Sequence, residues 1–274
     1  MDNKHYMLYD LDENKLDLLT ENELMVQIRL IAHVLDKQIQ FSQTRKTSFT
    51  ENELKKLTVR LDVYENKFDI KKPDYAWAVK VKELYIKGIA EQQNFVYPWE
   101  NKVNLNIHKE EFEKLILGRR SIRCFIEGEI PDEVIKEVIK YGSWAPNTCN
   151  MQALRYVVIR NPEIKQRVND GGFTGKMGNY IIAVIADYKF YDDWNIDGLI
   201  HDSAASIQNM LITCHYFGIG ACYISDQGVN LDKYREILKI KESEKVTAFI
   251  WLGIYDKVPI APARRNLDDI IEII

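Results

Sequence analysis

The feature that most constrains the fold is an uninterrupted apolar run in the second half of the chain. Six consecutive apolar residues, 181–186, lie between Tyr180 and Asp187. A run this short and this apolar is typical of a strand buried within a sheet, because a strand with one face in water would alternate apolar and polar residues. We therefore expect a strand over 180–187. β-Branched and aromatic residues gather at three further places where we expect strands, 155–160, 221–225 and 246–255.

Helical patterns separate these expected strands. A short helix is expected over 108–117, and Pro131 suits the first turn of another helix. A long helix over 197–217 ends at Gly218, since glycine is a natural C-terminal stop. The second half of the chain therefore alternates helices and strands. The expected apolar face of the short helix is made of Phe112, Leu115 and Ile116.

The first hundred residues have the apolar spacing of helices throughout. Thr20 with Glu23 forms a capping box before the first helix, and Thr50 with Glu53 repeats this signature before the second. Asp74 can cap a third helix. The first helix is expected to bury one stripe of apolar residues, namely Leu24, Ile28, Ile31, Leu35 and Ile39.

We place a domain boundary near residue 100, after the Pro98-Trp99 turn. Residues 1–100 then form a helical region, and residues 101–274 form a second domain. The plain interpretation of the helical region is a small bundle with a buried seam. The alternative is an element for dimerisation or partner docking.

Composition excludes several classes of function. The formal net charge of −4 does not suggest a general surface for nucleic acid. The four cysteines have no CxxC spacing and the five histidines form no ligand cluster, so we expect reduced thiols and no metal site. The N-terminus does not have the pattern of a secretory signal, and no apolar run approaches the ~20 residues that span a bilayer. We therefore expect a cytoplasmic protein without a membrane partner.

Two short segments are rich in arginine. The first, 119–123, has three arginines and Ser121 in five positions, and the second is the pair Arg264-Arg265 after the last expected strand. Arginine suits a phosphate because its guanidinium carries a permanent charge and a fork of donors. Taken alone, each segment is also compatible with a solvated basic turn.

A polar loop lies between an expected helix and the strand over 155–160. It holds the amides and the hydroxyl of Asn147, Thr148, Asn150 and Gln152. Such groups can bond to the edge of a heterocycle or to a polyol chain. The same composition also suits an ordinary surface loop, so the loop taken alone does not assign a site.

The order and spacing of these segments resemble the nitroreductase family of FMN-dependent enzymes over roughly residues 105–274. Each pattern is short, and it is their order along the chain that makes the resemblance specific. The matching positions are Arg119, Arg120, Ser121, Arg123 and Phe125 in the opening pattern, Ala145, Pro146, Asn147, Asn150 and Gln152 in the loop, Asp202, Gln208, Asn209, Gly218 and Gly220 in and after the long helix, and the closing Arg264 and Arg265.

The chain departs from the family pattern at three places. Asn147 stands where the family loop has serine, Ala153-Leu154 replace a frequent Pro-Trp, and Tyr223 replaces a common tryptophan. These departures bear on the substrate face, since none of them removes a phosphate ligand.

The resemblance implies an α+β fold with three α-β-α layers around a mostly antiparallel sheet, preceded here by the helical region. It also implies a homodimer with FMN at the interface. The implied cofactor contacts are Arg119, Arg120, Arg264 and Arg265 at the phosphate, Ser121 and Arg123 at the ribityl chain and ring edge, Pro146, Asn147, Thr148, Asn150 and Gln152 from the partner subunit, and Lys176 with the backbone of Ile224, Ser225 and Asp226 near the ring.

The function implied by the resemblance is reduction of a small acceptor, such as a nitro compound or a quinone, by NADH or NADPH in a ping-pong scheme. The flavin carries this chemistry, so no catalytic side chain is expected. A specialised dehydrogenase or dehalogenase is the alternative within the fold, which the added helices favour. A flavin-binding interaction protein with little turnover is the alternative in another class.

Two further segments lead to expectations. Four aromatic residues within 188–194 form either a lid over the flavin or a packed corner, and Tyr191 and Trp194 are the residues to test. The tail over 267–274 consists of acidic and apolar residues, and we expect it to reach over the partner subunit.

Overall fold

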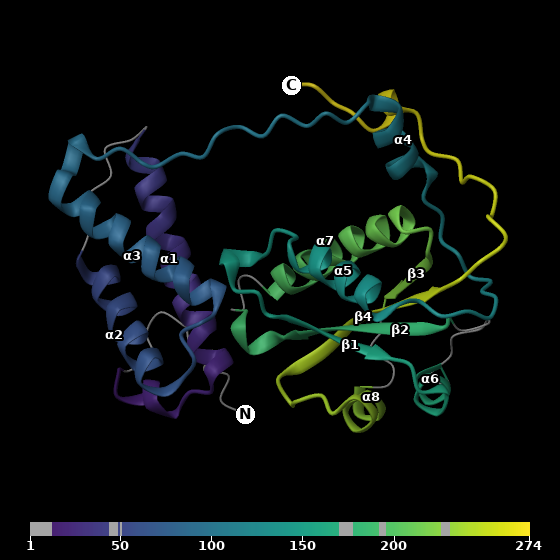
Figure 1. Ribbon diagram of the computed structural model, residues 1–274, viewed down its shortest axis with the longest axis horizontal. Coiled ribbons are helices and arrows are strands. Elements are labelled where there is room, and N and C mark those ends of the chain that lie inside the picture. Colours follow the sequence, from purple (N-terminus) through teal and green to yellow (C-terminus); the bar gives the residue numbers. More distant parts are fainter. Residues whose placement is uncertain (1–12, 44–48, 50, 170–177, 192–195, 226–230) are drawn as a thin grey trace.

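The computed structural model describes residues 13–43, 49, 51–169, 178–191, 196–225 and 231–274. A group of helices lies beside a larger body built on a sheet, and an extended linker joins the two along one side (Figure 1). Within the described residues, no helix has the length and apolarity needed to cross a bilayer.

The helical region packs three long helices around one core. They are α1 (Glu21–Ser42), α2 (Glu51–Lys67) and α3 (Pro73–Glu91), flanked by the short 3-10 helices η2 (Glu13–Leu18) and η3 (Gln92–Asn94). The expected stripe of α1 is confirmed, since all five of its apolar residues are fully buried in this core. The bundle interpretation of this region is therefore confirmed.

The helix starts show one confirmed cap and one correction. Thr20 and Glu23 form the expected capping box, whereas Thr50 lies outside the described residues. Asp74 does not cap α3, because the N-cap position is Lys72 and Pro73 begins the helix. The Asp74 carboxylate instead pairs with Arg29 of α1 at 2.7 Å.

The sheet has four strands in the order β1-β2-β4-β3, and every neighbouring pair is antiparallel. The strand β2 (Tyr180–Asp187) coincides with the expected range, and the other three differ from expectation by one or two residues at their ends. They are β1 (Leu154–Ile159), β3 (Gly220–Ser225) and β4 (Glu244–Gly253).

Helices cover both faces of this sheet, which gives the three layers that the resemblance implied. On one face α5 (Asp132–Ser143) and α7 (Ile196–Tyr216) pack against Ile182 and Val184 of β2. On the other face α6 (Pro162–Asn169) and α8 (Leu231–Leu238) pack on a core that includes the alternate residues of β2. The apolar run of β2 is therefore buried on both sides, as its composition predicted.

Three segments at the edge of the body remain open to solvent. They are the linker over 98–108, the helix α4 (Lys109–Gly118) and the tail over 256–274, which contains η7 (Leu267–Asp269). We call these three segments the perimeter. No residue of α4 is buried among the described residues, and Phe112 and Ile116 of its expected apolar face are exposed.

Candidate functional site

The arginine segment follows α4 directly and lies along the outer edge of the sheet. Ser121 forms a parallel bridge with Ala221 of β3, and the Ile122 N–H donates to the Ala221 carbonyl at 3.0 Å. Burial of Ile122 and Phe125 in the core anchors the segment. The Arg123 side chain between these two anchors is exposed to solvent.

The three arginines of this segment make different interactions. The Arg120 guanidinium donates to the carbonyls of Leu117 (2.5 Å) and Arg119 (2.9 Å), which stabilises the C-terminus of α4. Burial raises the pKa of the Cys222 thiol on β3, and the positive charges of Arg123 and Arg119 oppose this shift. Arg119 and Arg123 therefore place their charge beside the same strand.

The outer edge of β3 offers backbone groups next to these charges. Because Ala221 bonds to Ile122, its backbone faces away from β4. The alternation along a strand then turns the backbone groups of Tyr223 and Ser225 to the same outer side, and those of Ile224 toward β4. Negative charge on a bound ligand would find both cations and N–H donors at this edge.

The polar loop has an unusual backbone. Three of its non-glycine residues have positive φ angles, namely Cys149 (50°), Asn150 (55°) and Gln152 (52°). The loop includes η4 (Thr148–Asn150), and Asn147 accepts a hydrogen bond from the Gln152 N–H at 2.9 Å. Each such residue costs roughly 1–2 kcal/mol relative to an ordinary backbone, so contacts elsewhere must hold the loop.

Asp202 of α7 supplies one of these contacts. Its buried carboxylate accepts from the Thr148 N–H at 2.9 Å and from the Thr148 hydroxyl at 3.0 Å. The second carboxylate oxygen accepts from the Tyr191 hydroxyl at 2.8 Å. Burial and the Asp202 charge together raise the pKa of Tyr191, so this tyrosine remains a donor.

The loop and the arginine segment lie at opposite ends of α7. The loop is bonded to Asp202, whereas Arg119 lines a cavity with His215, 13 positions further along the helix. This separation corresponds to about 20 Å of helix. A second small cavity lies under the loop beside Asp202, and each of the two has a volume of about 100 Å³. Ligand pockets usually need about 300–1,000 Å³, so neither cavity is a complete cofactor site.

The closing arginines lie in the exposed tail. Val258 of the tail lines the cavity at Arg119, but Arg264 and Arg265 come after it and bond to the tail's own backbone. The described residues therefore do not bring the two arginine segments together within one chain.

Lys176 and Asp226 lie outside the described residues, as does Trp194 of the aromatic segment. Of the two alternatives for 188–194, the described part forms the packed corner and not the lid. Tyr188 and Phe190 both lie in the 3-10 helix η5 (Tyr188–Phe190). Phe190 is buried, and the next residue, Tyr191, is only 1% exposed. These aromatics form a packed corner because α1 covers them, which the local sequence did not reveal.

The fold itself is that of the nitroreductase-like α+β proteins. A nitroreductase family protein of Streptococcus pneumoniae TIGR4 superposes with a TM-score of 0.52 at 19% identity, and the match covers 59% of this chain and 98% of that one. The matched share of this chain is therefore little more than half.

Comparison of the sequence with known proteins shows the family as well as the fold. The model of the nitroreductase family matches residues 116–171. A candidate NADH dehydrogenase/NAD(P)H nitroreductase of Archaeoglobus fulgidus is 30% identical over 153 residues, which cover 53% of this chain and 85% of that protein. The chain belongs to the nitroreductase family of oxidoreductases.

Two further relatives differ in what their names describe. FMN reductase (NADPH) of Bacillus subtilis is 26% identical over 143 residues, covering 45% of this chain and 57% of the relative. Iodotyrosine deiodinase 1 of Sus scrofa is 32% identical over 74 residues, covering 27% of this chain and 25% of the relative.

Proposed function

We propose that the protein is a homodimeric, FMN-dependent oxidoreductase that takes electrons from NADH or NADPH and delivers them to a small acceptor such as a nitro compound or a quinone. When bound, FMN would supply the hydride and electron chemistry of a ping-pong cycle. The observation that carries the proposal is the position of two polar half-sites at opposite ends of α7, each too small for a cofactor. A second subunit that brings its loop to the arginine segment would complete the site.

The chain's residues suit the parts of FMN. Arg119, with Arg264 and Arg265, would hold the phosphate, and Arg120 would add its charge from the end of α4. Ser121 would bond to the ribityl chain. The partner subunit would contribute Pro146, Asn147, Thr148, Asn150 and Gln152.

The ring would lie along the outer edge of β3. There Arg123 and outward backbone N–H groups would stabilise negative charge as it builds on the ring, without reorganising. The alternation of β3 favours Tyr223 and Ser225 as these donors over Ile224. Lys176 and Asp226 remain proposed neighbours of the ring.

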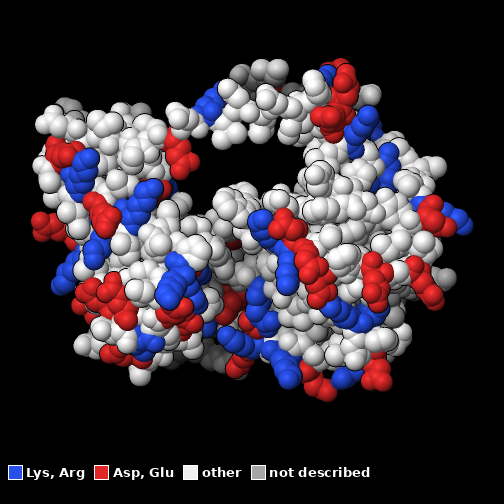
Figure 2. Space-filling view, viewed as in Figure 1, with Lys and Arg blue, Asp and Glu red and all other residues white. Residues whose placement is uncertain are grey.

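The perimeter supports the homodimer. The linker alternates polar residues with Val103, Leu105 and Ile107, and the exposed fraction of each apolar side chain is above one half. Figure 2 shows an opening between the linker and the rest of the molecule. The linker, α4 and the tail each carry several exposed apolar side chains, and a gathering of such side chains is typical of a protein interface. A second copy is the partner that the half-sites require.

A specialised dehalogenase or dehydrogenase of the same fold is the second candidate. The deiodinase relative favours it, since its name describes removal of a halogen and it shares part of this domain. A flavin-binding interaction protein with little turnover would differ from both, because no nicotinamide would reduce its flavin.

One experiment separates these candidates. The purified protein is loaded with FMN, and its molar mass is measured by light scattering. It is then mixed anaerobically with NADH or NADPH while the flavin absorbance is followed. We expect a dimer with about one FMN per chain, reduced by at least one nicotinamide. Bound flavin that neither nicotinamide reduces would favour the interaction protein, and a protein that binds no FMN would contradict the proposal.

A further inference from the structure

The helical region docks on the body through one face of α1. Val26 and Leu30 are buried against Met151, Phe190 and Tyr191, so α1 covers both the polar loop and the aromatic corner. This contact joins the part of the chain that the family comparison leaves unmatched to the loop proposed to serve the flavin.

Arg29 lies between these apolar contacts and is only 5% exposed. Its Nε and Nη2 atoms donate to the Met151 carbonyl at 3.1 and 2.8 Å, and its Nη1 atom donates to Asp74 at 2.7 Å. The planar guanidinium thus bridges α1, α3 and the loop in one fixed geometry. No lysine could make these three bonds, because a single ammonium lacks the fork of donors.

The bonded carbonyl lies at the strained part of the loop. Met151 is buried, whereas its neighbours Asn150 and Gln152 have positive φ angles, and the Gln152 side chain is exposed. Pulling the Met151 carbonyl inward therefore fixes the direction in which these two amides point. Without that bond, the backbone could relax toward ordinary angles and turn the amides elsewhere.

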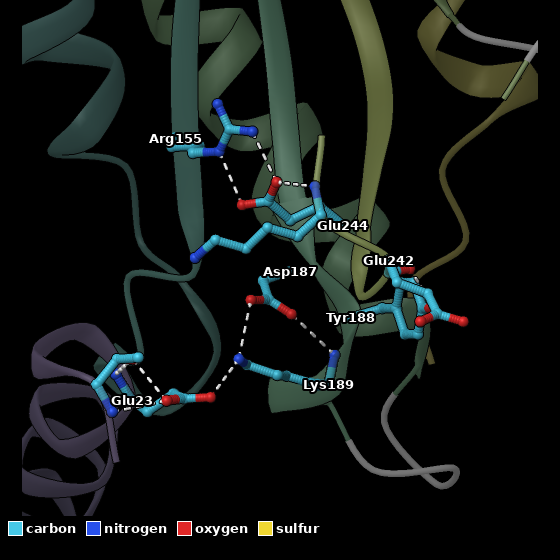
Figure 3. Close-up of polar contacts among 9 residues, drawn as sticks. Glu23, Arg155, Asp187, Tyr188, Lys189, Glu242 and Glu244 are labelled. Carbon is cyan, nitrogen blue, oxygen red and sulfur yellow. Dashed lines mark hydrogen bonds and ion pairs between the residues drawn. The ribbon is translucent and has the colours of Figure 1, made fainter. Parts of the chain in front are cut away.

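A second contact holds the N-terminal end of α1 against the sheet (Figure 3). Lys189 reaches Glu23 of α1 at 2.6 Å and Asp187, at the end of β2, at 3.6 Å. Two polar contacts with an apolar patch between them leave α1 little freedom to rotate or slide. Arg29 is therefore presented to the loop by a helix that is itself fixed.

We propose that Arg29, held by Asp74, is a positioning residue for the flavin site. It fixes the loop so that the amides of Asn150 and Gln152 point toward the flavin of the second subunit. The helical region then has a defined role, which is to set the geometry of a loop that is otherwise strained. This inference rests on the proposed FMN function.

The test compares two buried arginines of the helical region in the full-length protein. Arg29→Gln removes the bond to the loop. Arg60→Gln is the matched control, because Arg60 is equally buried but bonds to Gln27 and Lys56 within the bundle. Asp74→Asn keeps Arg29 and removes its counter-charge, and it serves if Arg29→Gln does not fold. The measurements are FMN affinity, visible circular dichroism of the bound flavin, and hydrogen exchange of the loop amides.

We expect Arg29→Gln to weaken FMN binding by roughly tenfold or more, which is the loss of a single charged contact. It should also change the dichroism of the flavin that remains bound and speed exchange at Thr148 and Gln152. Asp74→Asn should do the same to a smaller extent, and Arg60→Gln should do neither. Wild-type protein that binds FMN while both Arg29→Gln and Asp74→Asn match it would overturn this inference alone. Wild-type protein that binds no FMN would overturn the proposed function and this inference with it.

Discussion

The helical region and the perimeter of the body differ in how much of their apolar surface is buried within a single chain. The inner stripe of α1 is fully buried in the bundle, and its other side is covered by the body at Val26 and Arg29. In contrast, α4 buries no residue, and Ile260 and Ile273 of the tail are more than nine-tenths exposed.

This difference separates what one chain completes from what two chains would complete in the proposed homodimer. The helical region, which lies outside the matched family pattern, buries its apolar residues within the monomer. The arginine motifs of the family lie beside or within the perimeter, where apolar residues remain exposed. Exposed apolar surface of this kind marks an interaction site or an aggregation liability, so the difference favours a site that is built when two copies meet.

The contact between α1 and the body predicts the largest effect. Leu30→Ala removes a buried side chain from the contact between α1 and the body, and it should lower the free energy of unfolding by about 2–4 kcal/mol. Urea denaturation measures this change. Leu18→Ala is the control, because Leu18 is 82% exposed and its loss should change the free energy by less than about 0.5 kcal/mol. Equal effects of the two variants would break the distinction.

The arginine segment predicts the next effect. Arg119→Ala and Arg265→Ala should each weaken FMN binding by about 10- to 150-fold, since a charged hydrogen bond is worth roughly 1.5–3 kcal/mol. Flavin that stays bound should still be reduced at a near-normal rate. Arg123→Ala should instead slow single-turnover reduction by nicotinamide. If all three variants lose affinity alike and Arg123→Ala reduces normally when saturated with FMN, Arg123 does not lie at the ring.

The aromatic corner predicts a smaller effect on stability and none on specificity. Tyr191→Phe removes the hydroxyl that bonds to Asp202, and it should lower the free energy of unfolding by about 1 kcal/mol. Preference among acceptors should stay unchanged in steady-state assays, because Tyr191 is a packed residue. An altered preference at unchanged stability would restore the lid hypothesis.

The contact at the end of α1 predicts the smallest effect, which is a change in how stability depends on pH in acid. Hydrogen bonds from Lys189 and Thr20 outweigh the cost of burial and lower the pKa of Glu23 to about 2. A carboxyl whose folded pKa is depressed stabilises the fold above its ordinary value near 4.5 and loses that contribution as the pH falls toward 2. Glu23→Gln should therefore flatten the dependence of stability on pH in this window. An unchanged slope would show that Glu23 contributes nothing at this contact.

The sequence predicted most of the fold, because periodicity and caps act locally. The run of β2, the stripe of α1 and the capping box at Thr20 all depend on near neighbours in the chain. The boundary near residue 100 remains a proposal, although it falls within the open stretch between the bundle and α4.

The contacts of the candidate site were less accessible to sequence reasoning. The resemblance placed the loop and the arginine segment but could not show that α7 separates them in one chain. It also missed Arg29, whose only signal is a charge among the apolar residues of α1. For a related reason the sequence left Tyr191 open between a lid and a packed corner, since its burial depends on a helix more than 150 positions away.

The most direct test of the account asks whether one flavin site takes residues from two chains. Arg119→Ala chains are paired with chains that carry both Asn147→Ala and Gln152→Ala, and the heterodimer is purified by two different tags. Each homodimer has one defect in both of its sites. If the loop serves the partner's flavin, the heterodimer carries both defects in one site and none in the other, so one of its two sites should bind FMN with wild-type affinity. A heterodimer in which both sites are weakened would contradict the account, because it would show that each chain completes its own site.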